Sequence, residues 1–138
     1  MDNCVFCKII AGSIPSTTVY EDDDFKAIMD VSPAAKGHII ILPKKHVANI
    51  YEMDDDMASK VLIVAKKIAG AVKDELQCAG LNIIQNNGEV AGQTVFHYHM
   101  HIIPRNQGDN VKVTWEPGSY QDGEATRIAS ALKKRMLN

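Results

Sequence analysis

Three histidines stand at alternate positions in the stretch TVFHYHMHII, residues 94–103, of a chain that has only five histidines. In a β-strand, side chains at alternate positions point to one face, so His97, His99 and His101 would form a row of imidazoles. The residues between them are apolar, which favours a strand inside the fold over a solvated surface cluster. Imidazoles confined together have shifted pKa values and tautomers fixed by their neighbours, which is typical of functional sites. Such a row can serve as a catalytic device or bind a metal ion.

A glycine-rich loop, NNGEVAGQT at residues 86–94, runs directly into the histidine segment. Its glycines expose backbone N–H groups, and its asparagines, glutamine and threonine add polar side chains, so the loop is suited to cradling an anion. Such a loop is weak evidence by itself. Joined to three histidines, it indicates one site for a phosphate group and a nitrogen nucleophile.

Two cysteines, Cys4 and Cys7, form a second constellation in the stretch CVFC. A CxxC pair is typical both of redox sites and of half of a zinc site, and the βαβ context of a thioredoxin-like motif is missing here. The third cysteine, Cys78, is expected to be a small, buried apolar residue. Three cysteines with this spacing do not form a disulfide framework of the secreted type, so we expect reduced thiols.

The composition argues against several classes of protein. A length of 138 residues suits a single domain over residues 1–138, and the formal net charge of −2 offers no basic excess for holding a nucleic-acid backbone. The longest apolar stretches are too short to span a bilayer, and the first ten residues lack the order of a signal peptide. We therefore expect a cytoplasmic protein with neither a membrane nor a nucleic acid as its partner.

The elements that must position these residues follow from hydrophobic periodicity and turn signals. Strands are predicted at 17–22, 24–30, 37–43, 81–86 and 94–103, a short helix at 5–15, a long helix at 54–80 and a final amphipathic helix at about 122–136. The long helix has aspartates at its start and Gly80 as its predicted stop. Together they predict an α+β fold with about five mostly antiparallel strands and one long helix packed on one face.

The stretch GQTVFHYHMHII, residues 92–103, resembles the motif of the histidine-triad (HIT) superfamily, His-φ-His-φ-His-φ-φ with φ apolar, preceded by Gly-Gln-Ser/Thr-Val. Residues 6–47 are similar to the opening of its bacterial, Hint-like phosphoramidase branch. The resemblance covers about residues 4–105, whereas the tail and helix at 106–138 carry no family signature. It implies a HIT-like fold in which two subunits form a homodimer and share one extended sheet.

The chemistry that this resemblance implies is that of a nucleotide hydrolase or transferase, cleaving at the α-phosphorus of nucleoside 5′-phosphoramidates or related adenylates. His99 is then the nucleophile, and water releases the covalent nucleotidyl-histidine that it forms. His38 would orient and polarise the triad, while His101 and Thr94 would contact the phosphate and help the leaving group. No metal is required for this chemistry, because imidazoles and backbone donors can meet the phosphate charge.

The other matched positions imply a purine nucleotide, such as an AMP derivative, as the ligand. Asp30 matches the residue that bonds the ribose hydroxyls, while Asn86 and Gln93 match polar positions on the phosphate or ribose side. The apolar slot that holds the base is matched by Phe6, Ile28 and Val31. Without the family, ordinary core packing would be the favoured explanation for the first two of these.

The resemblance also supplies partners for CVFC, because some bacterial-looking family members place a Cys/Cys/His/His tetrahedron here. The implied zinc ligands are Cys4, Cys7, His46 and His97. Four protein ligands close the coordination sphere, so the zinc would be structural. His97 would then be a rigid anchor and not an acid or base, which leaves the chemistry to His99 and His101.

Other functions remain open from the sequence. The stretch HIIPR, residues 101–105, also continues the motif in the dinucleoside polyphosphate hydrolases of the family, which differ in the leaving group. The chain could instead be a nucleotide-binding regulatory or scaffold protein with incidental hydrolysis, or a metal-binding module that uses all three triad histidines. Trp115 could lie over a pocket of its own subunit or of a partner subunit.

Overall fold

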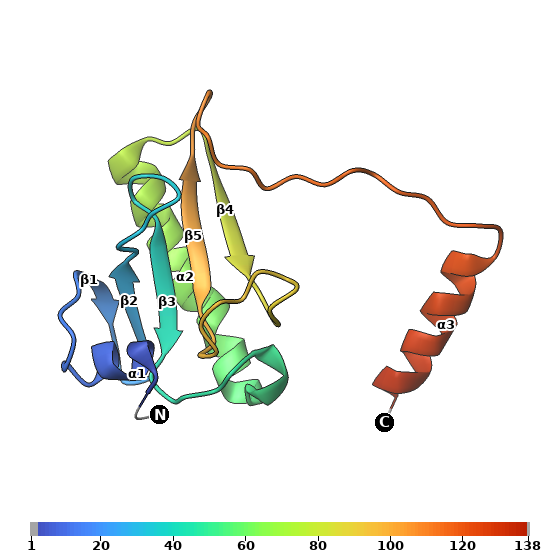
Figure 1. Cartoon of the computed structure of the whole chain (residues 1–138), viewed down its shortest axis with the longest axis horizontal. Helices are drawn as coiled ribbons and strands as arrows, with labels where there is room; N and C mark the ends of the chain where they lie inside the picture. Colours follow the sequence, from blue (N-terminus) through green and yellow to red (C-terminus); the bar gives the residue numbers. More distant parts are fainter. Residues whose placement is uncertain (1–2, 138) are drawn as a thin grey trace.

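The structure, a computed structural model, describes residues 3–137 and contains a sheet of five antiparallel strands (Figure 1). The strands lie in the order β1-β2-β3-β5-β4, with the bounds Thr18–Glu21 (β1), Phe25–Met29 (β2), Ile39–Pro43 (β3), Gly80–Gln85 (β4) and Met100–Arg105 (β5). The first three strands form a meander, and β5 pairs with both β3 and β4. The predicted α+β fold class is confirmed.

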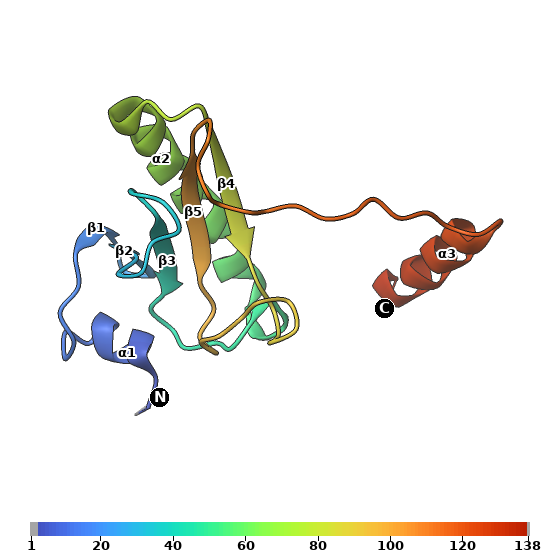
Figure 2. The same cartoon turned by 45° about the horizontal axis from the view of Figure 1, so that its top comes forward.

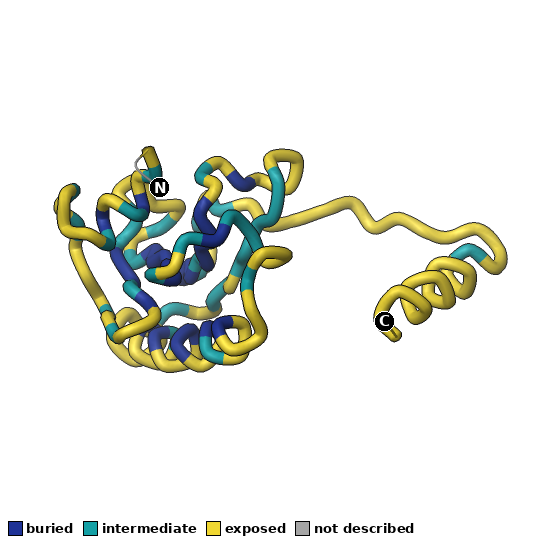
Figure 3. The backbone as a smooth tube through the Cα atoms, turned by 90° about the horizontal axis from the view of Figure 1, so that it is seen from below, coloured by how far each residue is buried: buried dark blue, intermediate teal, exposed yellow. Residues whose placement is uncertain are grey.

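The long helix, α2 (Asp55–Leu76), covers one face of the sheet (Figures 1 and 3). The side chain of Asp54 caps its start by accepting a backbone N–H of the first turn, and two further aspartates there complement the helix dipole. The helix ends where Gln77 adopts the left-handed conformation, with φ of 50°. The predicted stop at Gly80 is therefore wrong, because Gly80 is already paired with Arg105 as the first residue of β4.

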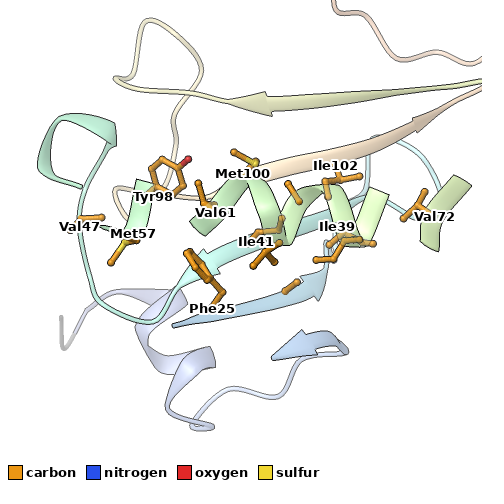
Figure 4. Packing of buried hydrophobic residues seen from close by; sticks show 14 residues of the cluster. Phe25, Ile39, Ile41, Val47, Met57, Val61, Val72, Tyr98, Met100 and Ile102 are labelled. Carbon is orange, nitrogen blue, oxygen red and sulfur yellow. The ribbon is translucent and has the colours of Figure 1, made fainter. Parts of the chain in front are cut away.

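The core lies in two layers on opposite faces of the sheet. On one face, the buried side of α2 packs against strand residues such as Phe25, Ile41 and Ile102 (Figure 4). The other face packs under the short helix α1 (Val5–Ile10), through Phe6, Ile9, Ile28, Ile40 and Leu42. All five residues of β3 are buried, as expected for a central strand that is apolar on both faces.

The histidine segment is only partly a strand, which corrects the prediction of a strand over residues 94–103. β5 begins at Met100, so His101 alone of the three triad histidines lies in it. His97 lies in a bend, and His99 stands just before the strand begins. The row of imidazoles is therefore built by a bend and a strand end together.

Backbone pairing with a loop explains the late start of β5. The Tyr98 N–H donates to the carbonyl of Val47, in the loop after β3, at 2.7 Å. The amide of the buried Gln93 donates to the carbonyls of Ala48 and Val95. The alternation of faces survives, because the α2 side of this segment is occupied by Tyr98, Met100 and Ile102 (Figure 4).

The remaining elements lie at the ends of the chain and in one loop. α1 ends at Ile10, earlier than the predicted residue 15, and a short 3-10 turn, η1 (Ile50–Glu52), precedes α2. The final helix, α3 (Glu124–Met136), forms near the predicted 122–136. It stands apart from the sheet, at the end of an extended arm made of residues 112–123 (Figures 1 and 2). Among the described residues, no helix is long and apolar enough to cross a membrane.

Candidate active site and metal centre

A cavity of about 450 Å³ lies between α1, the end of β2 and the segment that leads into β5. The sequence-predicted residues that it brings together are Phe6, Ile28, Asp30, Val31, Thr94, His99 and His101. One part of the lining is apolar and the other carries a carboxylate, a hydroxyl and two imidazoles. A cavity of this size and mixed polarity is suited to a nucleotide, with its base in the apolar part.

The tautomer of His99 is fixed by the backbone. The side chain is buried, and its Nδ1 lies 2.7 Å from the carbonyl oxygen of His97. A carbonyl only accepts hydrogen bonds, so Nδ1 carries the hydrogen and Nε2 keeps its lone pair. The ring of Phe6 stands edge-on to this imidazole with 5.0 Å between ring centroids. His99 is therefore a neutral imidazole, fixed in position by its neighbours, with one nucleophilic nitrogen.

His38 and His101 form a hydrogen-bonded chain whose direction is also set by the backbone. The Ala34 N–H donates to Nδ1 of His38 at 2.9 Å, so the hydrogen of neutral His38 sits on its Nε2. This Nε2–H donates to Nδ1 of His101 at 2.9 Å. The hydrogen of neutral His101 therefore sits on Nε2, from which it can be donated to a bound phosphate or leaving group.

Burial keeps these histidines in the neutral form. Desolvation, helped by the neighbouring His99 and His38, lowers the pKa of His101 to about 4, against an opposing pull from Asp30. Burial also lowers the pKa of His38, again against Asp30. The pKa of His99 is lowered by burial too, although its bond to the backbone opposes the shift. A nucleophilic nitrogen and the chain of hydrogen bonds both require these neutral forms.

We expect protonation of His101 to destabilise the fold. The unfolded chain binds this proton with the ordinary pKa of 6.5 and the folded chain only near 4, so acid favours the unfolded state. Between pH 7 and pH 5, His101 should lower the free energy of unfolding by about 2 kcal/mol, a loss that His101→Gln removes. Urea denaturation of both proteins at the two pH values measures this difference. The same pH dependence in both proteins would contradict it.

Two of the sequence-predicted binding residues, Asn86 and Gln93, lie outside the cavity lining. The Gln93 side chain is fully buried, accepts the Gly88 N–H through Oε1 and donates to two carbonyls, so it holds the glycine-rich loop in shape. The Asn86 side chain lies against Gly92, with Nδ2 3.3 Å from the position that a Cβ would take there. The structure thus places both residues in the architecture of the loop.

A second cluster brings together atoms that bind zinc. The ligand atoms of Cys4, Cys7, His46 and His97 all lie within 4.8 Å of one another. The Cys7 Sγ is 3.3 Å from Nδ1 of His46, and the two imidazole Nδ1 atoms are 3.1 Å apart. Tetrahedral zinc, with Zn–S near 2.3 Å and Zn–N near 2.0 Å, separates sulfur from nitrogen by roughly 3.5 Å and the nitrogens by roughly 3.3 Å. The four side chains fit such an ion.

His97 is oriented for a metal ion by its other nitrogen. Its Nε2 lies 2.8 Å from the carbonyl oxygen of Pro43, so Nε2 carries the hydrogen and Nδ1 directs its lone pair at the thiols. Burial lowers the pKa of His97 to about 4, which keeps the ring neutral, as a ligand must be. The Phe6 ring stands edge-on to both His97 and His99, so it connects the Cys/His cluster to the cavity.

A third group of potential ligand atoms comes from Asp30, His38 and His101. A metal ion there would need the lone pair of His38 Nε2. That nitrogen carries a hydrogen as long as the Ala34 N–H donates to Nδ1. The group is therefore a hydrogen-bonded chain of side chains, and the Cys/His cluster is the better candidate for a metal ion.

Sequence reasoning missed the groups that fix the tautomers, the Ala34 N–H and the Pro43 carbonyl. No residue type identifies them, because every residue carries the same backbone groups. One signal was present in Gly37, directly before His38. It has a φ of 97°, which a residue with a side chain adopts only with strain, so the turn before His38 favours glycine.

Comparisons of sequence place the chain among known relatives. The HIT domain family matches residues 11–108. The Protein hit of Bacillus subtilis is 47% identical over 140 residues, which cover 99% of this chain and 97% of that protein. The adenosine 5′-monophosphoramidase hnt1 of Schizosaccharomyces pombe is 38% identical over 135 residues, which cover 97% of this chain and 98% of that one.

Comparisons of structure agree with those of sequence. The crystal structure of a HIT family member from Bacillus subtilis superposes with a TM-score of 0.92 at 48% identity and covers 96% of each chain. The structure of a Zn-bound histidine triad family protein from Mycobacterium smegmatis gives a TM-score of 0.76 at 34% identity over 98% of each chain. The likeness therefore extends along nearly the whole chain.

Proposed function

The chain belongs to the HIT domain family, and from this premise we propose that it is a nucleotide hydrolase or transferase acting at the α-phosphorus of nucleoside 5′-phosphoramidates or related adenylates. The observation that carries the proposal is the state of His99. Its Nδ1–H is held by a carbonyl and its pKa is lowered by burial, so an unprotonated Nε2 is available in the lining of a nucleotide-sized cavity. The resemblance to a named phosphoramidase supports the choice of substrate.

The proposed reaction has two displacements. In the first, the Nε2 lone pair of His99 attacks the α-phosphorus, a bond from nitrogen to phosphorus forms, and the bond to the leaving group breaks with its electron pair. The bond from Nδ1–H to the His97 carbonyl stabilises the positive charge that develops on the ring. In the second, water attacks the same phosphorus, a bond from oxygen to phosphorus forms, and the bond from phosphorus to Nε2 breaks with its electron pair returning to the ring. The nucleoside monophosphate is released and His99 is regenerated.

One proton is passed between the two displacements. An amine leaving group takes it up in the first step, and the attacking water gives one back in the second. We assign this transfer to His101, which lines the cavity and is held by the hydrogen bond from His38.

The cavity offers one region for each part of a purine nucleotide. The buried Phe6 and Ile28 line the apolar region, and the exposed Val31 borders it, so this region is assigned to the base. The carboxylate of Asp30 is assigned to the ribose hydroxyls. Thr94, at the end of the glycine-rich loop, is assigned to the phosphate. The resemblance implies that the loop residues Asn86 and Gln93 contact the nucleotide, and here they would act by shaping that loop.

The Cys/His cluster is proposed to hold a structural zinc ion. A bound ion would supply closed tetrahedral coordination, tying the start of the chain and the loop after β3 to the first triad histidine, His97. In that state His97 fixes the bend before His99 and takes no part in proton transfer. His99 and His101 then carry the chemistry without a metal ion at the phosphate.

We further propose that the protein is a cytoplasmic homodimer in which the sheet continues across β4. This strand is an open edge of the sheet. Large apolar side chains are exposed on it and on α2, namely Ile83, Leu62 and Ile63. An open edge beside exposed apolar residues favours pairing with a second copy. The net charge of −2 gives no support to a nucleic-acid partner.

Parallel assays with adenosine 5′-phosphoramidate and diadenosine polyphosphates test the proposed function. We expect release of AMP from the phosphoramidate with the higher kcat/KM. Faster cleavage of the dinucleotides would assign the protein to dinucleoside polyphosphate hydrolysis. AMP binding with no turnover of either substrate would contradict the enzyme and favour a nucleotide-binding scaffold.

Removing the charge of Asp30 should weaken the contact between the protein and the ribose of the substrate. We expect Asp30→Asn to raise KM for adenosine 5′-phosphoramidate about tenfold, because a charged acceptor for two hydroxyls becomes a neutral amide. The 2′,3′-dideoxy substrate is the matched control, and its KM should change little. Steady-state kinetics with both substrates checks this. Equal effects on the two substrates would show that Asp30 acts through His38, whose Nε2 lies 3.5 Å from its carboxylate, rather than on the ribose.

A further inference from the structure

The apolar face of α3 is covered by no other described residue of its own chain. Ile128, Leu132 and Met136 recur every fourth residue, so they share one face, and all three are exposed. The last turn of the helix is basic. An isolated helix of 13 residues is at the margin of stability in water. To be stable, α3 therefore needs a folded surface against which its apolar face can pack.

The arm that carries α3 is fixed where it leaves the sheet. Arg105, at the end of β5, pairs with both carboxylate oxygens of Asp109, at 2.8 and 2.9 Å. It also donates to the Asn82 side chain in β4 and to the carbonyl of Val111. From this anchor, residues 112–123 run past β4, and α3 lies beyond that open edge (Figures 1 and 2). The structure thus directs α3 away from its own sheet.

A solved relative superposes along almost the whole chain. The Bacillus subtilis structure superposes with a TM-score of 0.92 over 96% of this chain. An alignment of that extent must include most of the arm and of α3, and a displaced helix would lower the score. The extent of the alignment therefore favours the same placement of α3 in that relative.

A groove that suits an amphipathic helix lies at the opposite side of the sheet from β4. It has a volume of about 440 Å³ and runs between α2 and the strands β1 and β2. Its floor is apolar, through residues such as Val19, Met29, Ile68 and Ala71, while Lys67 and Glu75 stand among the lining residues. Charges of both signs there complement α3, which has Glu124 in its first turn and basic residues in its last.

The length of the arm matches the distance to this groove on a neighbouring molecule. An extended segment such as residues 112–123 spans roughly 40 Å at about 3.3 Å per residue. Five strands spaced about 4.8 Å apart occupy roughly 20–25 Å. An arm that passes the β4 edge can therefore cross the whole sheet of a second copy joined at that edge, and reach its groove beside β1.

We propose that α3 docks in trans, with Ile128 and Leu132 in the groove between α2 and β1–β2 of a second copy, so that two chains exchange their arms. The inference rests on the β4-edge dimer of the proposed function and not on its chemistry. Helix α3 then acts as a clamp that each subunit closes on the other. Trp115, on the arm, is 81% exposed in its own chain and would lie against the second copy.

Hydrogen exchange in mixed dimers tests the exchange of arms. One chain carries Ile128→Asp and Leu132→Asp, which spoil its helix face, and the other carries Ala71→Arg, which fills its groove. Mass spectrometry separates their α3 peptides, because the substitutions change the mass. Each variant alone should exchange its α3 amides at least tenfold faster than the native protein. After co-expression, the native α3 of the Ala71→Arg chain should regain its protection, because its partner has an open groove.

The control substitution is Ser130→Asp, on the opposite face of α3, which should leave the exchange of the helix unchanged. Fast exchange of α3 in the native protein, or no recovery in the co-expressed pair, would overturn the inference. Sedimentation of the native protein measures whether the dimer itself forms. A dimer with an unprotected α3 overturns only the clamp, and a monomer overturns both, whereas neither result bears on phosphoramidate hydrolysis.

Discussion

Replacing His99 with alanine should lower kcat/KM for adenosine 5′-phosphoramidate by at least about 10⁴-fold. The reason is that the replacement removes the nucleophile that the cavity presents. His101 cannot take over, because the hydrogen bond that it accepts at Nδ1 leaves the hydrogen on its Nε2. Steady-state kinetics on the purified variant measures the loss. A reduction of less than tenfold would contradict nucleophilic attack by His99.

Two measurements separate this loss from a general disturbance of the cavity. The affinity of His99→Ala for AMP should stay within a few-fold of the native value, because Asp30 and the apolar slot remain. His101→Gln, which keeps a hydrogen-bond donor but cannot transfer a proton, should lose only about 10²-fold in kcat/KM. A scaffold protein would behave differently, since it would retain its cellular role when His99 is replaced.

Replacing Cys7 with serine should reduce the zinc content of the protein from one ion per chain to none. The same variant should lose at least about 3 kcal/mol in free energy of unfolding, since a structural zinc ion binds only the folded state. The loss is large because three other ligands would be left without their ion. Elemental analysis of protein purified without chelators gives the stoichiometry, and urea denaturation gives the stability.

The matched control is Cys78→Ser, which removes a partly buried thiol outside the cluster. Zinc content should then be unchanged, and the stability loss should be about 1 kcal/mol. Treatment of the native protein with a chelator should reproduce the effect of Cys7→Ser and leave that variant unaffected. An unchanged zinc content in Cys7→Ser would remove the assignment of the four ligands.

Much of the site was predictable, because residue types and spacing carry its chemistry. The alternation of His97, His99 and His101 predicts three imidazoles on one side, and the structure keeps that alternation although only His101 lies in the strand. The CVFC stretch predicts half of a zinc site, and the structure brings His46 and His97 to it. Periodicity also predicts α2, whose buried face fills the core in Figure 4.

Other features have no counterpart in residue type. The strand begins late because the Tyr98 N–H pairs with the loop after β3, a bond between backbone groups that any residue could make. The tautomers of His38 and His97 depend on Ala34 and Pro43 for the same reason. Periodicity shows that α3 is amphipathic, yet it does not show which surface receives it. That placement depends on the Arg105 anchor and the direction of the arm.

Covalent trapping is the sharpest test of nucleophilic attack by His99. Native protein is mixed with adenosine 5′-phosphoramidate, and the reaction is stopped within milliseconds by alkaline denaturant, which preserves bonds between histidine and phosphorus. Mass spectrometry of the peptide that spans residues 94–105 should show one adenylyl group on His99, absent from His99→Ala. Turnover of the substrate without any adduct on this peptide, or an adduct on His101 instead, would contradict nucleophilic attack by His99.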